Sequence, residues 1–433
     1  FAMIGSAMSG VTFVSVPGMV ATSGFGYMQM ALGFIAGQLV IAFVLIPLFY
    51  RRNLVSIYGY LESRFGVSSY KTGAWFFFIS KMLGASVRLF LACISLQVMV
   101  FGPLGIPFWV NVAVTVAILI LYTYRGGVKA VIWIDSLKTI CMITAIVLCT
   151  VFISKALGFT FGSMLQAVSE SDMSRVFFFD DPNHPQYFLK QFFGGMFTVI
   201  AMTGLDQDMM QRSLTCRNIS DSQKNIVTST ILQTVVIAMF LILGVLLYMF
   251  ADVEGISGAT GDKTFPAVAT SGLLPASVGI LFVIGLISCS YSAGGSALTA
   301  LTTSFTIDIL GTGGKSEAQV KTMRERVHLL MAVCMGVTII IFNMINSTSA
   351  IDAVYKLASY TYGPILGMFT FGILTKRKVN DKFVPLAAIV APVLCLILQL
   401  NSERWFGGYQ FSYELLIINA LFTIIGLWIS SKK

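Results

Sequence analysis

The sequence predicts an all-α membrane protein whose chain crosses the bilayer many times. Of its 433 residues, 56% are hydrophobic and only 11% are charged, whereas a soluble domain carries about 25% charged residues. Apolar runs of about 20 residues, the length of a membrane-spanning helix, recur along the whole chain. These runs are continuous rather than alternating, as in VAVTVAILILY. Because backbone polar groups must be satisfied inside the bilayer, continuous runs indicate helices rather than a barrel.

Twelve apolar segments are expected to form the helices. They cover roughly residues 1–16, 27–50, 72–101, 107–124, 131–157, 188–210, 225–250, 276–309, 327–346, 350–375, 381–400 and 413–431. The first segment meets Pro17 and Gly18, so we expect it to be half of a broken helix.

Basic residues predict the orientation of these spans. If the segment 51–71 is cytoplasmic, the inner segments hold 19 of the 28 Lys and Arg residues and the outer segments hold five. Since Lys and Arg collect on the cytoplasmic side, we expect a multi-pass protein of the cell (plasma or inner) membrane. The expected cytoplasmic parts are 51–71, 125–130, 211–224, 311–327, 376–382 and the C-terminus. The same bias accounts for the net charge of +9 without a nucleic-acid partner.

Neither an enzyme nor a disulfide framework is indicated. The seven cysteines lie mostly within apolar runs and form no CxxC pair, which is typical of small buried residues. The two histidines, His184 and His328, suggest no metal cluster. No spaced pair of nucleophile and base is recognisable.

Charged residues within the spans are the first indication of a site, because they are costly in lipid and usually face a cavity or a partner. They include Lys81, Arg88, Asp135, Asp206, Asp208 and Lys356. Weak helices are the second indication. GSAMSGVTFVSVPG and FGGMFTVIAMTG lie in the first and sixth spans, and discontinuous helices in matching positions mark a binding site at the membrane midplane. Close packing of helices through small residues is the alternative.

A polar stripe in the eighth span is the third indication. Cys289, Ser292 and Ser296 are spaced i, i+3 and i+7, so they share one helix face. Such hydroxyls usually bond to their own i−4 carbonyl. Facing an unwound segment, they could instead supply oxygen ligands to sodium.

Six segments occur in an order that resembles the solute:sodium symporters, the group of sodium–glucose, proline, sialic acid, iodide and vitamin transporters. They are SIYGYLESRFG, YTYRGGVKAVIWIDSLKT, GLDQDMMQRSL, TFPAVATSGLLPASVG, SFTIDIL and SYTYGPILGMFTFGIL. The resemblance implies a LeuT-type 5+5 inverted repeat of transmembrane helices with additional peripheral helices. It divides the chain into one transport core, 1–376, with inverted repeats at 1–157 and 188–376, and two peripheral helices in 377–433. It also implies a family helix before Phe1.

The resemblance further implies a main sodium site. Its ligands would be the backbone carbonyls of Gly5, Met8 and Cys289 and the hydroxyl of Ser292. The family pattern has a second hydroxyl where this chain has Ala293. Losing one oxygen ligand costs about 1–3 kcal/mol by analogy with hydrogen bonds to charged groups, or about 10- to 100-fold in affinity, unless a water replaces it.

Some members have a second sodium site. Asp135, Ser292 and Ser296 match it, but Gly295 stands in place of a hydroxyl. A proton carried by Asp135 is therefore an alternative to sodium as the coupling ion.

Substrate positions match the family less well. They fall at or near Ser9, Thr12, Phe13, Gln29 and Arg88. The family's contact on the second helix falls on Ala31, close to Gln29. The carboxylate-binding arginine of sialic-acid-type members falls on Gly84, and Arg88 lies one turn further. Arg88 could clamp a carboxylate in a bidentate manner or pair internally. Lys81 and Lys356 are expected to extend to the interface or to pair internally.

We therefore expect a sodium-coupled symporter that imports a small polar organic solute, such as a sugar, sialic acid, carboxylate or amino acid, by alternating access. Arg88 and Lys81 favour an anionic solute. The expected partners are the solute, the sodium ion and the lipid bilayer, with no obligate protein partner. Because Ala293 lacks a hydroxyl, a proton-coupled or uncoupled transporter or channel of the same fold is the alternative. A sensor that binds solute without moving it is a further one.

Overall fold

The structure is a computed structural model that describes residues 10–51, 57–214, 216, 218–256, 258, 260–345 and 350–432. Within these ranges the side chains at 125–137, 211, 212, 214, 345, 350 and 351 are not described. The predicted residues Gly5, Met8 and Ser9 therefore lie outside the described residues, and so does the side chain of Asp135.

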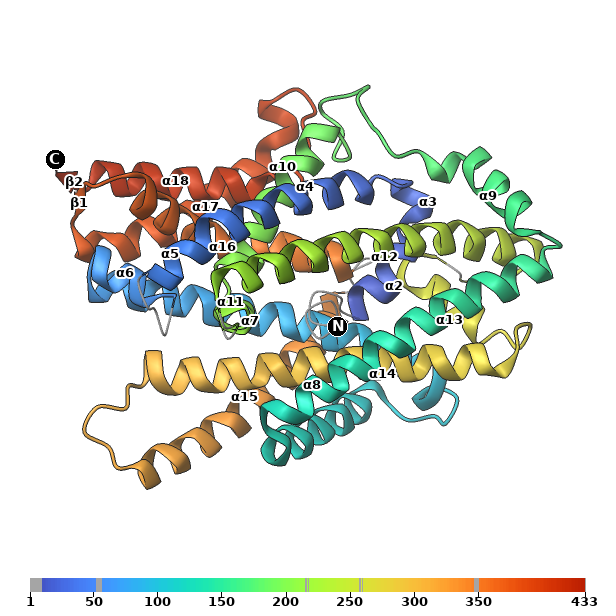
Figure 1. Ribbon diagram of the computed structural model, residues 1–433, viewed down its shortest axis with the longest axis horizontal. Coiled ribbons are helices and arrows are strands. Elements are labelled where there is room, and N and C mark those ends of the chain that lie inside the picture. Colours follow the sequence, from blue (N-terminus) through green and yellow to red (C-terminus); the bar gives the residue numbers. More distant parts are fainter. Residues whose placement is uncertain are drawn as a thin grey trace.

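Helices make up almost all of the described chain (Figure 1). They are α2 (Gly10–Gly18), α3 (Val20–Ser23), α4 (Tyr27–Val40), α5 (Ile46–Arg51), α6 (Gly59–Arg64), α7 (Val67–Leu96), α8 (Phe108–Ala156), α9 (Phe161–Glu170), α10 (Phe188–Val199), α11 (Gln207–Leu214), α12 (Ile219–Val253), α13 (Thr264–Ala269), α14 (Ala276–Ser304), α15 (Glu317–Ile345), α16 (Ala350–Leu374), α17 (Val384–Trp405) and α18 (Leu415–Ile429).

Shorter elements extend or separate these helices. The π-helical turns are η1 (Ile41–Leu45), η2 (Gln97–Phe101), η4 (Ile200–Gly204) and η6 (Phe305–Ile309). The 3₁₀ turns are η3 (Asp172–Ser174), η5 (Gly261–Lys263) and η7 (Asp381–Phe383), and the strands β1 (Lys378–Val379) and β2 (Ser431–Lys432) pair antiparallel.

The lengths and compositions of the helices confirm a polytopic membrane protein. In the described part of the chain, eight helices are long and apolar enough to span a bilayer, and Phe108–Tyr124 and Leu415–Ile429 are shorter apolar helices. Figure 1 shows the long helices running roughly along one axis, with the C-terminus at one end and α9 at the other.

The predicted loop at 125–130 is wrong, because α8 runs without interruption from Phe108 to Ala156. A straight helix of 49 residues would be about 74 Å long at 1.5 Å per residue, more than twice the thickness of the hydrocarbon core. In Figure 1 the first and last parts of α8 run in different directions, so it still supplies two apolar segments.

Other predicted loops are shorter in the structure than in the sequence analysis. In the segment 311–327, α15 begins at Glu317, and in 211–224, α12 begins at Ile219. Residues such as Glu, Gln, Lys and Arg are good helix formers, so these helices continue beyond their apolar parts. The ends of apolar runs therefore do not mark the ends of these helices.

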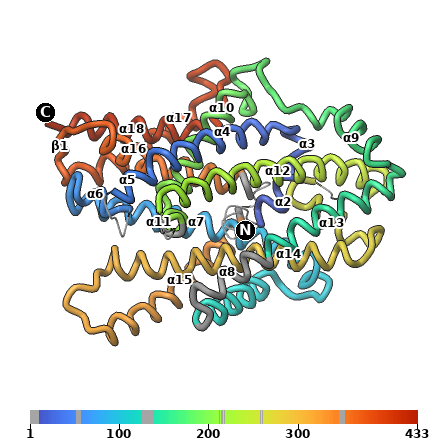
Figure 2. Tube along the Cα trace, in the orientation of Figure 1, coloured from blue at the N-terminus to red at the C-terminus, as the bar shows by residue number. Residues whose placement is uncertain are grey.

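Close helix packing joins α4 to α10, which lie side by side although they are far apart in sequence (Figure 2). A Cβ atom on Gly33 would lie 2.1 Å from the Phe192 carbonyl oxygen, and one on Gly195 would lie 2.5 Å from the Met30 carbonyl oxygen. The two backbones are thus in direct contact. Gly195 lies in FGGMFTVIAMTG, where close packing of helices through small residues was the alternative to a binding site. Its contact with Met30 shows that this glycine serves helix packing.

The two ends of the chain's C-terminal part are tied to the bundle. The carboxylate of Asp381 accepts hydrogen bonds from the backbone N–H groups of Ser68 and Ser69, each at 2.8 Å. It therefore caps the N-terminus of α7. Asn419 on α18 donates to the carbonyl oxygens of Ser359 and Tyr360 on α16, at 2.9 and 3.0 Å, so α18 is held against α16.

The backbone contact between α4 and α10 predicts a strong effect of one added methyl group. Gly33→Ala should lower the free energy of unfolding by about 1–3 kcal/mol, the usual cost of overpacking, and the thermal midpoint in detergent should fall. Gly59→Ala is the matched control, because no atom lies within 4 Å of the added Cβ. Equal midpoints for the two variants would contradict the close contact.

Candidate functional site

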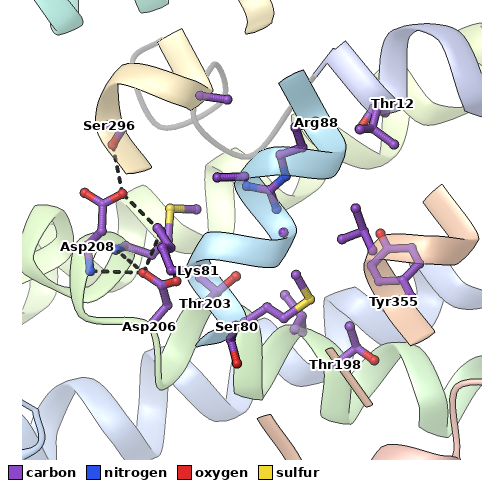
Figure 3. A pocket seen from close by; sticks show the side chains of 18 of the residues that line it. Thr12, Ser80, Lys81, Arg88, Thr198, Thr203, Asp206, Asp208, Ser296 and Tyr355 are labelled. Carbon is purple, nitrogen blue, oxygen red and sulfur yellow. Dashed lines mark hydrogen bonds and ion pairs between the residues drawn. The ribbon is translucent and has the colours of Figure 1, made fainter. Parts of the chain in front are cut away.

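A cavity of about 160 Å³ lies inside the bundle. Its walls come from α2, α4, α7, α8, α10 with η4, α11, α12, α14 and α16. Figure 3 shows the polar side chains that surround it. Polar and charged groups at this depth indicate a solute or ion pathway, because lipid would not tolerate them.

A break in the sixth predicted span places two acidic residues in the cavity wall. The π-helical turn Ile200–Gly204 ends α10, and a new helix, α11, starts at Gln207. Asp206 caps α11, since its Oδ1 accepts hydrogen bonds from the backbone N–H groups of Asp208 and Met209 at 3.0 and 3.1 Å. This is the usual arrangement of an aspartate N-cap. The predicted weakness of this span is therefore a real discontinuity.

Lys81 on α7 makes a buried ion-pair cluster with these aspartates (Figure 3). Its Nζ lies 3.1 and 3.0 Å from the two carboxylate oxygens of Asp206 and 3.3 Å from Oδ2 of Asp208. Tyr362 on α16 donates to Oδ2 of Asp206 at 2.9 Å. The Lys81 and Asp206 side chains are only 9% and 3% exposed. The predicted internal pairing of Lys81 is thus present in the structure.

Ser296 joins the same cluster from α14. Its hydroxyl donates to Oδ2 of Asp208 at 2.8 Å. The resemblance placed this residue in a second sodium site with Asp135, whose side chain lies outside the described residues. In the structure the hydroxyl proton of Ser296 is directed at an aspartate of α11.

Arg88 lies two helical turns beyond Lys81 on α7 and lines the same cavity. It is half-buried and close enough to Tyr355 and Tyr362 to interact with both electrostatically. Among the described residues, no hydrogen bond or ion pair reaches its guanidinium group. In Figure 3, Thr12, Tyr355 and Thr198 are labelled polar side chains on the side of Arg88 that faces away from the Lys81 cluster.

The described residues of the predicted main sodium site lie where α2 meets α14. Ser292 and Ala293 line the cavity. Cys289 is fully buried, and a Cβ on Gly10, the first described residue, would lie 3.6 Å from its Cβ. The first described residue of the chain therefore lies beside Cys289.

Two predicted substrate residues lie away from the cavity wall. Phe13 is fully buried and its ring packs against the rings of Phe265 and Phe282, with centroids 5.2 Å apart in each case. Gln29 is also fully buried, and its amide donates to the Gln186 carbonyl at 3.0 Å and accepts from the Phe178 N–H at 3.1 Å. These contacts make Phe13 a core residue and Gln29 an anchor for the loop before α10. Thr12 and Arg88 do line the cavity.

Several cavity residues were not singled out from the sequence. They include Lys138, Thr198, Thr203, Tyr355 and Tyr362. Thr198 and Thr203 lie in FGGMFTVIAMTG, so its small and polar composition was the available signal. Tyr355 and Tyr362 lie in α16, where no feature of the sequence distinguishes them from other interfacial tyrosines.

The family model for the sodium:solute symporter family matches residues 1–382. The chain belongs to this family. Its predicted function class, sodium-coupled solute symport, is thereby confirmed.

The relatives of this symporter transport different solutes. The sodium/sialic acid symporter NanT of Aliivibrio fischeri is 26% identical over 97% of this chain and 84% of its own length. The sodium-coupled monocarboxylate transporter 1 of Xenopus laevis is 24% identical over 85% of this chain and 60% of its own length. The solved structure of a Na⁺-coupled sialic acid symporter in a substrate-bound, outward-open state has a TM-score of 0.82 at 19% identity, covering 100% of this chain and 89% of that one. This structural match confirms the predicted LeuT-type fold.

The buried cluster predicts that the symporter depends strongly on Asp206 for stability. Asp206→Ala removes the N-cap of α11 and leaves Lys81 without one of its carboxylates. Breaking a buried ion pair costs about 3–5 kcal/mol, so the thermal midpoint in detergent should fall sharply.

Asp180→Ala provides the control for this measurement. Asp180 pairs with Arg175, but the two side chains are 72% and 49% exposed. Exposed pairs contribute about 0–1 kcal/mol, so this midpoint should hardly change. If the thermal midpoint falls equally in the two alanine variants, the buried Lys81 cluster does not stabilise the protein more than an exposed ion pair does.

Proposed function

We propose that the symporter imports a small organic monoanion, most simply a monocarboxylate, and that Arg88 binds its carboxylate. The observation that carries this proposal is the Arg88 guanidinium, which lines the cavity without a hydrogen-bond or ion-pair partner among the described residues. A guanidinium group suits a carboxylate because two parallel N–H donors match its two oxygens.

The charges around the cavity favour one negative charge on the solute. Lys81 is neutralised by the aspartates of α11, so it is not available to a solute, contrary to the sequence-based suggestion. Lys138 also lines the cavity, but it is 1% exposed and already has an interaction partner. Among the described cations that line the cavity, Arg88 is the one that remains for binding.

The size of the cavity favours a small solute. Its volume of about 160 Å³ is below the approximately 300–1,000 Å³ of pockets that hold drug-sized ligands. The named relatives carry sialic acid and monocarboxylates, both of which have a carboxylate. A small monocarboxylate carries the single negative charge that the cavity favours and fits the volume of the cavity.

For sodium, we propose binding at the junction of α2 and α14. The carbonyls of Gly5, Met8 and Cys289 and the hydroxyl of Ser292 would supply the ligands. The support is that Ser292 lines the cavity and Cys289 lies beside Gly10. Asp135 and Ser296, which the resemblance placed in a second sodium site, are proposed only as further polar groups near the main sodium site.

The proposed organisation follows from the same contacts. The transport core comprises residues 1–376, with repeats at 1–157 and 188–376, and α17 and α18 are peripheral. Lys81 of the first repeat pairs with Asp206 of the second, which fits a site shared by both. The excess of basic residues at the predicted inner segments supports insertion in the cell membrane with those segments in the cytoplasm.

Arg88→Gln tests the carboxylate contact. Hydrogen bonds to charged groups contribute about 1.5–3 kcal/mol, so transport efficiency for the monoanion should fall about 10- to 100-fold. The measurement is sodium-driven uptake of radiolabelled acetate, lactate and pyruvate into proteoliposomes, with unlabelled carboxamide analogues as competitors.

Lys356→Gln is the control for this charge change, because Lys356 is exposed on α16. Lys356→Gln should take up the carboxylates as efficiently as the unmodified protein does. Carboxamides should not compete with carboxylate uptake in either protein. Unchanged carboxylate uptake by Arg88→Gln would overturn the assignment of Arg88.

Ala293→Ser tests the proposed sodium site by restoring an oxygen. Ala293 is half-buried and lines the cavity, so there is room for a hydroxyl. The sodium concentration for half-maximal uptake should fall about 10- to 100-fold, since one oxygen ligand contributes about 1–3 kcal/mol. Ala300→Ser adds the same group to α14 outside the cavity and should have no effect. If both variants behave alike, Ala293 does not face the ion.

A further inference from the structure

The cluster around Lys81 has the composition of a cation site. It collects both oxygens of Asp206 and one of Asp208 around a single position, and Ser296 bonds to Asp208 beside it. Carboxylate and hydroxyl oxygens are the ligands that hard cations such as sodium prefer in proteins. The cluster also lines the cavity of a protein that carries sodium.

The position between these carboxylates is occupied by the ammonium group of Lys81. Its Nζ contacts three carboxylate oxygens at 3.0 to 3.3 Å. Lys81 is attached to α7 and cannot leave with the solute, whereas a bound sodium ion would be released on each cycle. Lys81 and Asp206 are both almost fully buried, and a buried charge is retained only with its partner.

We infer that Lys81 is a built-in cation that takes the place of a sodium ion between Asp206 and Asp208. Lys81 thereby determines how many sodium ions the protein binds. It prevents a coupling ion from binding between the two aspartates, in the most acidic part of the cavity. The inference needs sodium transport by this family, and it does not depend on the proposed solute.

The contact between Ser296 and Asp208 supports this role. Ser296 lies one helical turn beyond Ser292 on α14, so the cluster and the proposed main sodium site are adjacent. A second sodium ion beside Ser296 would lie close to the Lys81 ammonium, and like charges at such short separation repel. The hydroxyl of Ser296 instead completes the shell of the lysine-bound carboxylate.

Equilibrium binding of ²²Na⁺ to the purified protein tests the inference without any solute. Lys81→Met keeps an unbranched side chain, one atom shorter than lysine, and removes the charge. It should bind about one sodium ion more per chain than the unmodified protein. Lys81→Arg retains the cation and should leave the number unchanged.

A purely structural ion pair predicts a different result. In that case Lys81→Met would be less stable but would bind the same number of sodium ions. The triple variant Lys81→Met/Asp206→Asn/Asp208→Asn removes all three charges and should return the number to that of the unmodified protein.

Lys81→Met is expected to fold poorly when no cation neutralises the two aspartates. The inference therefore also predicts that sodium chloride, and not choline chloride at the same ionic strength, raises its thermal midpoint and its yield of folded protein. An unchanged number of bound sodium ions in folded Lys81→Met, or no selective rescue by sodium when folding fails, would overturn the inference.

Discussion

The buried contact between Lys81 and the aspartates of α11 holds the cavity of this symporter together. It connects α7 to the break between η4 and α11, while Tyr362 and Ser296 bring α16 and α14 to the same carboxylates. Each of these helices alone would expose a charge or an unpaired hydroxyl inside the membrane. Together they satisfy one another, because desolvated charges are stable only with hydrogen-bonded partners.

Much of the fold could be predicted from the sequence, because the bilayer limits the possible structures. The segment predicted at 276–309 coincides with α14 and η6, and the break in the sixth span lies where small residues accumulate. The connection at 125–130 could not be predicted, since two glycines suggest a turn while the structure keeps α8 helical. Hydropathy reports burial in lipid, and it does not report whether a helix continues beyond the lipid.

The site could be predicted only in part, because residue types do not specify which helix faces meet. Lys81, Asp206 and Arg88 were recognisable as charges in spans, but their division into a buried pair and a cavity-facing cation requires the packing of α7. Phe13 follows Thr12 directly, yet Thr12 lines the cavity and Phe13 enters an aromatic core. Neighbouring residues on a helix point in directions about 100° apart, so a small error in rotation exchanges a binding residue for a core residue.

The backbone contact between α4 and α10 constrains how this molecule can move. At Gly33 and Gly195 the two backbones touch, and the side chains of Met30 and Val199 pack against Gly195 and Gly37 of the facing helix. Because these surfaces interlock, we expect a rotation of one half of the transporter against the other to move the two helices together as one unit. Gly204 of η4 also packs against Ile41 of η1, which places two π-helical turns together at one end of that unit, where the helical hydrogen bonding is already irregular.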